Sequence, residues 1–446
     1  MEKREHLSSR IGFLLLSAGC AIGVGNVWKF PWLAGQNGGG GFVLLYLVFV
    51  ILLGLPVMIM ELSLGRASQA SPVKMYQKLE KPGQKWHLHG YFALLGNICL
   101  MAFYTTVAGW ILYYFVKFLT GQSAGLNLGS MVSVPATNVI FMGIAVTIGF
   151  VVVSFKLQGG VERLTKYMMS ALFILMLGLG VYCCTLDGAG EGLRFYLLPD
   201  FAKMTPSMVV SAMNQAFFSL SLGIGSMAIF GSYIGKDRSL MSEAVSIAGL
   251  DTLAAFMAGL IIFPACSSYG VEVNSGPKLL FNTMATVFNN MKGGRVMGTV
   301  FFLFMVFAAM STVFAVFENI LACVRELTGW SRRKGSIICA IGIFLLSLTT
   351  SLGFNLWAGF VPFGASSSWL DLWDFVVNFN LLPLGSVVYV LFCCTRYGWG
   401  WENLVAEANT GKGLKIKSWM KPIFCYVVPV AVIILYVIGL IDYPWK

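Results

Sequence analysis

Residues 19–26 of the chain read GCAIGVGN and residues 219–226 read SLSLGIGS, and each stretch interrupts a long apolar run. Glycine in a helix interior costs about 1 kcal/mol relative to alanine. Paired glycines beside serine or asparagine therefore favour local unwinding. Backbone groups freed inside a bilayer cannot face lipid, so they must line a cavity. Close helix packing by small residues would explain one such stretch, but two of them indicate a shared site.

The composition around these stretches is that of an integral membrane protein. Of the 446 residues, 57% are hydrophobic and 11% are charged, and the mean hydropathy is +0.79. Soluble domains carry about 25% charged residues, so an ordinary soluble enzyme, a disordered protein and a nucleic-acid binder are excluded. Most of the ten cysteines lie in apolar runs without a CxxC pair, and we expect them to be reduced packing residues rather than metal ligands.

The hydropathy pattern predicts an all-α protein with eleven membrane-spanning segments, because a helix needs about 20 apolar residues to cross a bilayer. A short amphipathic segment at 277–290 is too polar to cross. The predicted spans lie near 11–36, 41–64, 91–118, 136–155, 167–186, 207–234, 243–269, 297–327, 336–353, 372–395 and 421–441.

Charge asymmetry predicts the orientation of these spans. Most of the 30 lysines and arginines fall in alternate loops, which include the segment before the first span. Since positive loops stay in the cytoplasm, we expect a cytoplasmic N-terminus and an external C-terminus. The longest loops, around 187–206 and 397–419, are too small for a soluble domain. Residues 1–446 should therefore form a single transmembrane domain whose function lies within the membrane.

The two interrupted spans occupy matching positions, as the first span of each set of five. This predicts a 5+5 inverted repeat, with repeats at about 11–186 and 207–395 and an extra helix at about 421–441. A broken helix presents a positive and a negative end near the bilayer centre. The positive end suits a carboxylate and the free carbonyls suit a cation, so the pair can bind a zwitterion beside sodium.

Several charged side chains at membrane depth mark functional candidates. We expect Glu61 and Glu318 to accept hydrogen bonds from backbone amides at a helix break. Asp251, with Asn26 and Ser219, forms the hard-oxygen set that sodium prefers. Asp374 is the fourth such carboxylate, and Lys29 is the outward-facing cation for one of the four. Ser311 and Thr312 add two hydroxyls on adjacent residues.

Long motifs across the whole chain resemble the neurotransmitter:sodium symporter family, in its bacterial eleven-span branch of the LeuT type. They are GCAIGVGNVWKFP at 19–31, QNGGG at 36–40, ELSLGR at 61–66, FFSLSLG at 217–223 and LDLWDF at 370–375. The resemblance implies a non-enzymatic symporter in the bacterial inner (cytoplasmic) membrane. It would use a sodium gradient and alternating access to import an amino acid.

The resemblance also implies binding residues. A first sodium ion would be held by the substrate carboxylate together with Ala21, Asn26, Ser219 and Asp251. A second ion would be held by Gly19, Ile22, Ala308, Ser311 and Thr312. The substrate pocket would comprise Cys20, Ala21, Gly23, Gly25, Leu100, Tyr104, Phe218, Ser219, Ser221, Ile224, Thr312 and Val316, with Tyr104 bonded to the carboxylate and Phe218 as a lid.

Two gates follow from the same resemblance. The outer gate would pair Lys29 with Asp374 beside Gln215. The inner gate would pair Arg4 with Glu326, with Ser232 and Tyr233 nearby. Lysine stands where the family usually has arginine, so the outer gate should be looser, because an ammonium lacks the planar guanidinium fork.

The residues around the pocket narrow the substrate. Monoamine-transporting members have an aspartate where this chain has Gly23, so the substrate should bring its own carboxylate. Leu100, Ile224 and Val316 favour a neutral hydrophobic side chain, aromatic or aliphatic. Asp251 replaces the commoner asparagine, and its charge should make chloride unnecessary.

Three other functions are alternatives to sodium symport. A proton-coupled permease of the same architecture would titrate a carboxylate such as Asp251 or Glu318. A channel would need a continuous pore without Phe218 and Tyr104 across it. An embedded enzyme would need a general base at depth, whereas the three histidines are expected at the inner surface.

Overall fold

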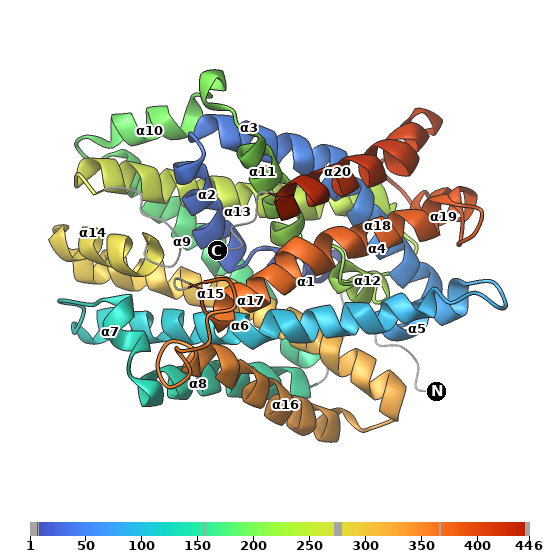
Figure 1. Ribbon diagram of the computed structural model, residues 1–446, viewed down its shortest axis with the longest axis horizontal. Helices are drawn as coiled ribbons and strands as arrows, with labels where there is room; N and C mark the ends of the chain where they lie inside the picture. The colour runs from blue at the N-terminus through green and yellow to red at the C-terminus, as the bar shows by residue number, and fades with distance from the viewer. Residues whose placement is uncertain (1–6, 8, 156, 272–278, 365–366, 442–446) are drawn as a thin grey trace.

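The computed structural model describes residues 7, 9–155, 157–271, 279–364 and 367–441. Within those ranges the protein is almost entirely helical, and it contains two isolated β-bridges in place of a sheet. Figure 1 shows the long helices lying side by side along one direction. The all-α membrane architecture expected from hydropathy is confirmed.

Nine continuous helical segments among the described residues are long and apolar enough to cross a bilayer. Several contain a short π-helical turn within one continuous helical segment. They are α3 and α4 (Gly40–Phe49 and Leu55–Ser68, joined by Val50–Gly54), α6 (His87–Thr120), α8 (Pro135–Ser154), α9 (Arg163–Cys184, after Gln158–Glu162), α13 (Leu240–Ser268), α15 (Gly294–Thr328), α16 (Arg332–Leu352), α17 and α18 (Trp369–Asp374 and Leu382–Cys394, joined by Phe375–Leu381) and α20 (Val428–Ile441, after Ile423–Val427).

The remaining two predicted spans are broken. The first consists of α1 (Arg10–Ala21) and, after a break, the π-turn Gly25–Lys29 and α2 (Phe30–Gln36), and its two halves are bent by 54°. The second consists of α11 (Pro206–Ser219) and α12 (Ser226–Gly231), separated by residues 220–225. These interruptions are the two stretches that the sequence singled out. The assignment of the two repeats to particular residues stays a prediction.

Short helices cover the two ends of the bundle. In Figure 1, α7, α10 and α14 lie at one end, while α5 and α19 lie at the other. Their bounds are Leu128–Val132, Ala189–Leu197 and Met284–Asn290 for the first group, and Pro72–Leu79 and Trp401–Ala408 for the second, with single 3-10 turns at Phe201–Lys203 and Ser418–Met420. α14 belongs to the amphipathic segment predicted at 277–290.

Small residues bring α4 and α12 close together. A Cβ added to Gly65 would lie 1.9 Å from the Ala228 carbonyl oxygen, and one added to Gly231 would lie 2.4 Å from the Leu62 carbonyl oxygen. Between apolar lipid tails such backbone approach is a main source of helix association, because burial of apolar area drives little there. This packing fixes α12 against a continuous helix and so anchors one side of the second break.

We predict that Gly65→Ala lowers the free energy of unfolding by about 1–3 kcal/mol, the usual cost of overpacking. The matched control is Gly249→Ala in α13, where an added Cβ meets nothing within 4 Å. Thermal unfolding of both variants in detergent measures the difference. Equal melting temperatures for the two variants would contradict the close approach of the two backbones.

Candidate functional site

The first break is shaped by a tyrosine from a neighbouring span. The α1 helix ends at Ala21, and Ile22 is extended with φ −72° and ψ 95°. The freed amide of Val24 donates to the Tyr104 hydroxyl at 2.9 Å, and the Gly23 amide donates to Asn26 Oδ1 at 3.3 Å. A Cβ at Gly23 would lie 2.3 Å from the Tyr104 hydroxyl oxygen, so glycine is required there.

The second break is held by Glu61 of α4. Its carboxylate accepts from the amides of Gly223 at 2.6 Å and Met227 at 3.0 Å. Residues 221, 223 and 225 have φ of 53°, 94° and 73°, left-handed values that explain the two glycines. The role expected for Glu61 from the sequence is therefore confirmed.

The expectation for Glu318 is wrong. Its carboxylate accepts from the Tyr233 hydroxyl at 3.0 Å and pairs with the Arg332 guanidinium, rather than with backbone amides at a break. An arginine at the start of α16 reaches α15 because the two helices are consecutive and antiparallel. The sequence alone does not reveal that Glu318 pairs with the Arg332 guanidinium rather than with backbone amides at a helix break.

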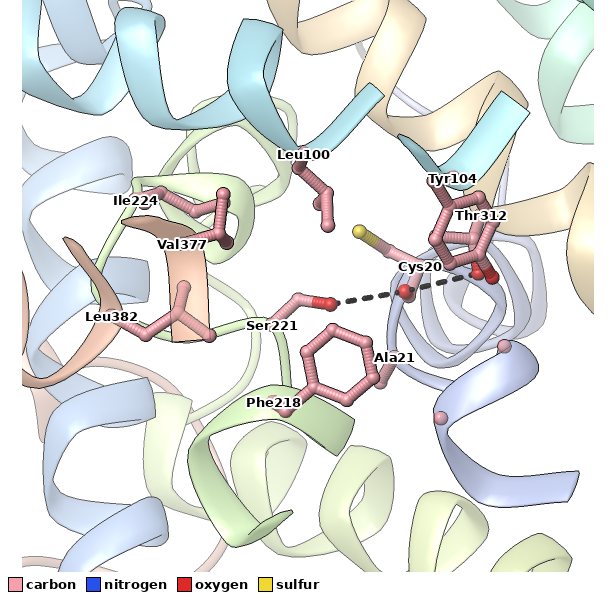
Figure 2. Close-up of a pocket in the computed structure, with 12 residues that line it drawn as sticks. Cys20, Ala21, Leu100, Tyr104, Phe218, Ser221, Ile224, Thr312, Val377 and Leu382 are labelled. Carbon is pink, nitrogen blue, oxygen red and sulfur yellow. Dashed lines mark hydrogen bonds between the residues drawn. The ribbon is translucent and has the colours of Figure 1, made fainter. Parts of the chain in front are cut away.

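The two breaks contact each other directly. Ser221 Oγ donates to the Cys20 carbonyl at 3.2 Å, and Gln215 Nε2 donates to the Gly25 carbonyl at 2.9 Å. Figure 2 shows the Ser221 bond crossing from one broken helix to the other, with the Thr312 hydroxyl on the far side of the same carbonyl. Polar groups of one interrupted helix thus satisfy those of the other.

A small enclosed cavity lies between the breaks. Its volume is about 20 Å³, enough for roughly one water molecule. It is lined by Cys20, Ala21, Gly23, Gly25, Leu100, Tyr104, Phe218, Ser221, Ile224, Thr312, Val377 and Leu382.

Most of the residues predicted to form the pocket line this cavity. Ser219 and Val316 do not; both are buried beside it. Val377 and Leu382 line it, although neither was predicted to do so. Both belong to the tenth span and are ordinary apolar residues, so no sequence signal distinguishes them from lipid-facing neighbours.

The cavity has two chemically different ends. Tyr104, Thr312 and the glycine backbone of the first break form one end (Figure 2). Leu100, Ile224, Val377 and Leu382 form the other, which is apolar, as the separate grouping of these side chains in Figure 2 shows. Such a shape suits a molecule with a polar head and an apolar side chain.

A cluster of hard oxygen atoms is buried next to the first break. Asn26 Nδ2 donates to Asp251 Oδ1 at 2.7 Å and to its backbone carbonyl at 3.0 Å. The Tyr46 hydroxyl lies 3.1 Å from Asp251 Oδ2 and 3.0 Å from Ser219 Oγ. The structure thus joins Asn26, Ser219 and Asp251 as predicted. It adds Tyr46, which was not predicted because an aromatic in an apolar span carries no special signal.

A second cluster joins α1 to α15. Thr312 Oγ1 lies 3.2 Å from the Gly19 carbonyl oxygen, and Ser311 Oγ donates to the Ala308 carbonyl at 2.9 Å. Ile22 is fully buried just beyond the end of α1. Neither cluster contains three His, Cys, Asp or Glu side chains, and the described residues contain no such group elsewhere. Carbonyl and hydroxyl oxygens with at most one carboxylate suit a hard monovalent cation.

An ion pair lies beside Phe218, where the outer gate is predicted. Lys29 Nζ lies 3.0 Å from Asp374 Oδ1 and 4.7 Å from the centroid of the Phe218 ring. Lys29, Asp374 and Phe218 are therefore close together, and Gln215 bonds to the Gly25 carbonyl one turn before Lys29. Their role as an outer gate stays a prediction. The ammonium thus contacts the Phe218 ring while it pairs with Asp374 of α17.

Around the predicted inner gate the structure shows contacts that the sequence did not predict, and the pairing of Arg4 with Glu326 stays a prediction. Glu326 accepts from the Ser71 amide at 3.1 Å and from its hydroxyl at 2.7 Å, while Tyr233 donates to Glu318. Ser232 donates to the Ile229 carbonyl at 2.6 Å. Arg4, the predicted partner of Glu326, lies outside the described residues.

Two helices broken at mid-bundle, an enclosed cavity between them and adjacent oxygen clusters define an ion-coupled secondary transporter of the LeuT type. Sequence comparison agrees, since residues 4–127 and 122–446 match the sodium:neurotransmitter symporter family. The chain belongs to that family, whose members are transporters rather than enzymes.

Individual relatives match over the full length. An uncharacterised sodium-dependent transporter of Bacillus subtilis is 34% identical over 99% of both chains, and one of Haemophilus influenzae is 31% identical over 98% of this chain and 99% of its own. The crystal structure of MhsT in complex with L-phenylalanine superposes with a TM-score of 0.89 at 33% identity, covering 98% of this chain and 99% of MhsT.

The second break yields a prediction. Glu61→Leu leaves the Gly223 and Met227 amides without their acceptor, at a cost of about 1–3 kcal/mol each. Glu61→Gln keeps one carbonyl oxygen and should cost less. Thermal unfolding in detergent ranks the variants, and Glu61→Leu as stable as wild type would show that the amides find other partners.

Proposed function

We propose that this protein imports a neutral hydrophobic L-amino acid together with two sodium ions and without chloride. The observation that carries the proposal is the two-ended cavity, with backbone and hydroxyl groups at one end and only apolar side chains at the other. MhsT, which shares the fold, has L-phenylalanine bound in its crystal structure.

The polar end favours an amino acid over an amine. No carboxylate side chain lines the cavity among the described residues, so a cationic amine would have no counter-charge there. An amino acid carries its own carboxylate, which can face the Tyr104 hydroxyl and the sodium ion of the Asp251 cluster together. Sodium and substrate then complete each other's sites, and their binding is cooperative in both directions.

The two oxygen clusters are the proposed sodium sites. Asn26, Ser219 and Asp251 with the Ala21 carbonyl would hold the ion nearest the substrate. Ser311 and Thr312 with the carbonyls of Gly19, Ile22 and Ala308 would hold the second. A charge crossing 100 mV is worth about 2.3 kcal/mol and a tenfold gradient about 1.4 kcal/mol, so two ions supply about 7 kcal/mol.

Import requires the cavity to enlarge and open. At about 20 Å³ it is too small for a hydrophobic amino acid, so the lid and the apolar wall must move apart when substrate enters. Separation of Lys29 from Asp374 would release Phe218 outward. We propose that opening alternates between this side and the side of Glu326, with the N-terminus in the cytoplasm of a bacterial cell and the C-terminus outside.

Binding by the purified protein tests this function. We predict that a few hydrophobic amino acids from a panel of twenty raise the melting temperature in sodium buffer and not in choline buffer. A ligand at 100 times its Kd stabilises the folded state by about 2.7 kcal/mol. Stabilisation that is independent of sodium would instead favour a proton-coupled permease of the same architecture.

The buried carboxylate of Asp251 yields a separate prediction. In proteoliposomes, replacing chloride with gluconate should leave wild-type uptake unchanged, because Asp251 supplies the negative charge. Asp251→Asn should abolish uptake or make it depend on chloride, while Asp187→Asn, which removes an exposed carboxylate, should do neither. Uptake by Asp251→Asn that matches wild type in both buffers would refute this role of the charge.

A further inference from the structure

Ile224 forms part of the apolar wall of the cavity and sits in the unwound segment between α11 and α12. Figure 2 shows its side chain beside Val377, across the cavity from Cys20. Two left-handed glycines flank it, Gly223 and Gly225. Glu61 fixes the amides of Gly223 and Met227 on either side of Ile224, so the contacts of the Ile224 side chain and carbonyl determine how far it projects into the cavity.

A glycine of α6 lies directly against the Ile224 side chain. A Cβ added to Gly96 would lie 2.5 Å from Ile224 Cγ2 and 3.2 Å from Ile224 Cβ. Non-bonded carbon atoms do not approach within 3.0 Å of each other, so a side chain at position 96 requires Ile224 or α6 to shift. Gly96 lies one turn from Leu100 on the same helix, and Leu100 lines the cavity.

The next residue of α6 holds the backbone of Ile224. Asn97 Nδ2 donates to the Ile224 carbonyl at 2.7 Å, and Asn97 Oδ1 accepts from Ser226 Oγ at 3.3 Å. Asn97 is itself buried and bonded to the Ala93 carbonyl at 2.7 Å. The side-chain amide of Asn97 is therefore fixed to α6 while it hydrogen-bonds to the residues on both sides of Gly225.

We propose that Gly96 and Asn97 are specificity-determining positioning residues, which hold Ile224 back from the cavity and so set the largest substrate side chain that fits. Neither residue lines the cavity, and both act through Ile224. The inference rests on the proposed function, because it assumes that the apolar end of the cavity receives the substrate side chain.

Gly96→Ala tests the contact between α6 and the Ile224 side chain. The added methyl group drives Ile224 toward the cavity, so the Kd for L-phenylalanine should rise at least about tenfold more than the Kd for L-valine, as a methylene-sized change in a hydrophobic pocket does. Thermal stabilisation in sodium buffer, titrated with each amino acid, gives both Kd values. If wild type does not bind phenylalanine, L-leucine and L-alanine form the pair.

Two controls separate positioning from general damage. Gly178→Ala adds the same methyl group to α9, at a position where nothing lies within 4 Å. It should leave the ratio of the phenylalanine Kd to the valine Kd unchanged. In an Ile224→Ala background, which lacks Cγ2, Gly96→Ala should change the ratio less than about twofold, because the contact that transmits its effect is gone. Asn97→Ala should raise the ratio of the phenylalanine Kd to the valine Kd, because Ile224 loses the hydrogen bond that holds it back from the cavity.

The outcomes distinguish the inference from the function on which it rests. If wild type binds hydrophobic amino acids in sodium but Gly96→Ala raises all Kd values by the same factor, the positioning role is refuted and the function stands. The positioning role is also refuted if Gly96→Ala shifts the ratio equally with and without Ile224. If wild type binds no hydrophobic amino acid, the proposed function itself fails.

Discussion

Backbone polar groups at the centre of a bilayer need partners inside the protein, and the two broken helices find them in neighbouring spans and in each other. Glu61 accepts hydrogen bonds from backbone amides of the second break, and the Tyr104 hydroxyl accepts one from an amide of the first. Ser221 and Gln215 then tie the two breaks together. Removal of these partners would leave unpaired groups in a low-dielectric medium, where each costs several kcal/mol. The continuous helices around the breaks therefore serve as a frame that keeps the irregular backbone satisfied.

The same constraint explains why binding and coupling belong together. Some backbone N–H and C=O groups at the breaks have no side chain as a hydrogen-bond partner. They can bind a ligand only where they face the cavity or an oxygen cluster. The first break contributes to both, because Ala21 and Gly25 line the cavity while Asn26 bonds to Asp251. In the proposed function, an ion and a substrate at this break would share its electrostatic field. Coupling would then be a property of one short segment rather than a signal sent between distant sites.

The predicted outer gate differs in character from the predicted inner gate. Lys29 combines an ion pair with a cation–π contact to Phe218, so a single ammonium links this ring to α17. On the other side, carboxylates are distributed among several partners, Glu318 with Tyr233 and Arg332, and Glu326 with Ser71. The side chains of Lys29 and Asp374 are 16% and 27% exposed, whereas those of Arg332 and Glu318 are 13% and 2% exposed. Solvent ions therefore screen the first pair more than the second.

Hydropathy and glycine placement are local properties, and they were enough to predict the membrane class, the approximate spans and the two breaks. Resemblance to the family placed Asn26, Ser219 and Asp251 together, as the structure also does. The three-dimensional packing was needed to find that Tyr46 joins this cluster, that Val377 and Leu382 reach the cavity, and that Glu318 pairs with Arg332 instead of a helix break. It was also needed to find that Gly96 and Asn97 support Ile224. Each of these contacts depends on which faces of distant helices meet, and no local pattern of residues carries that information.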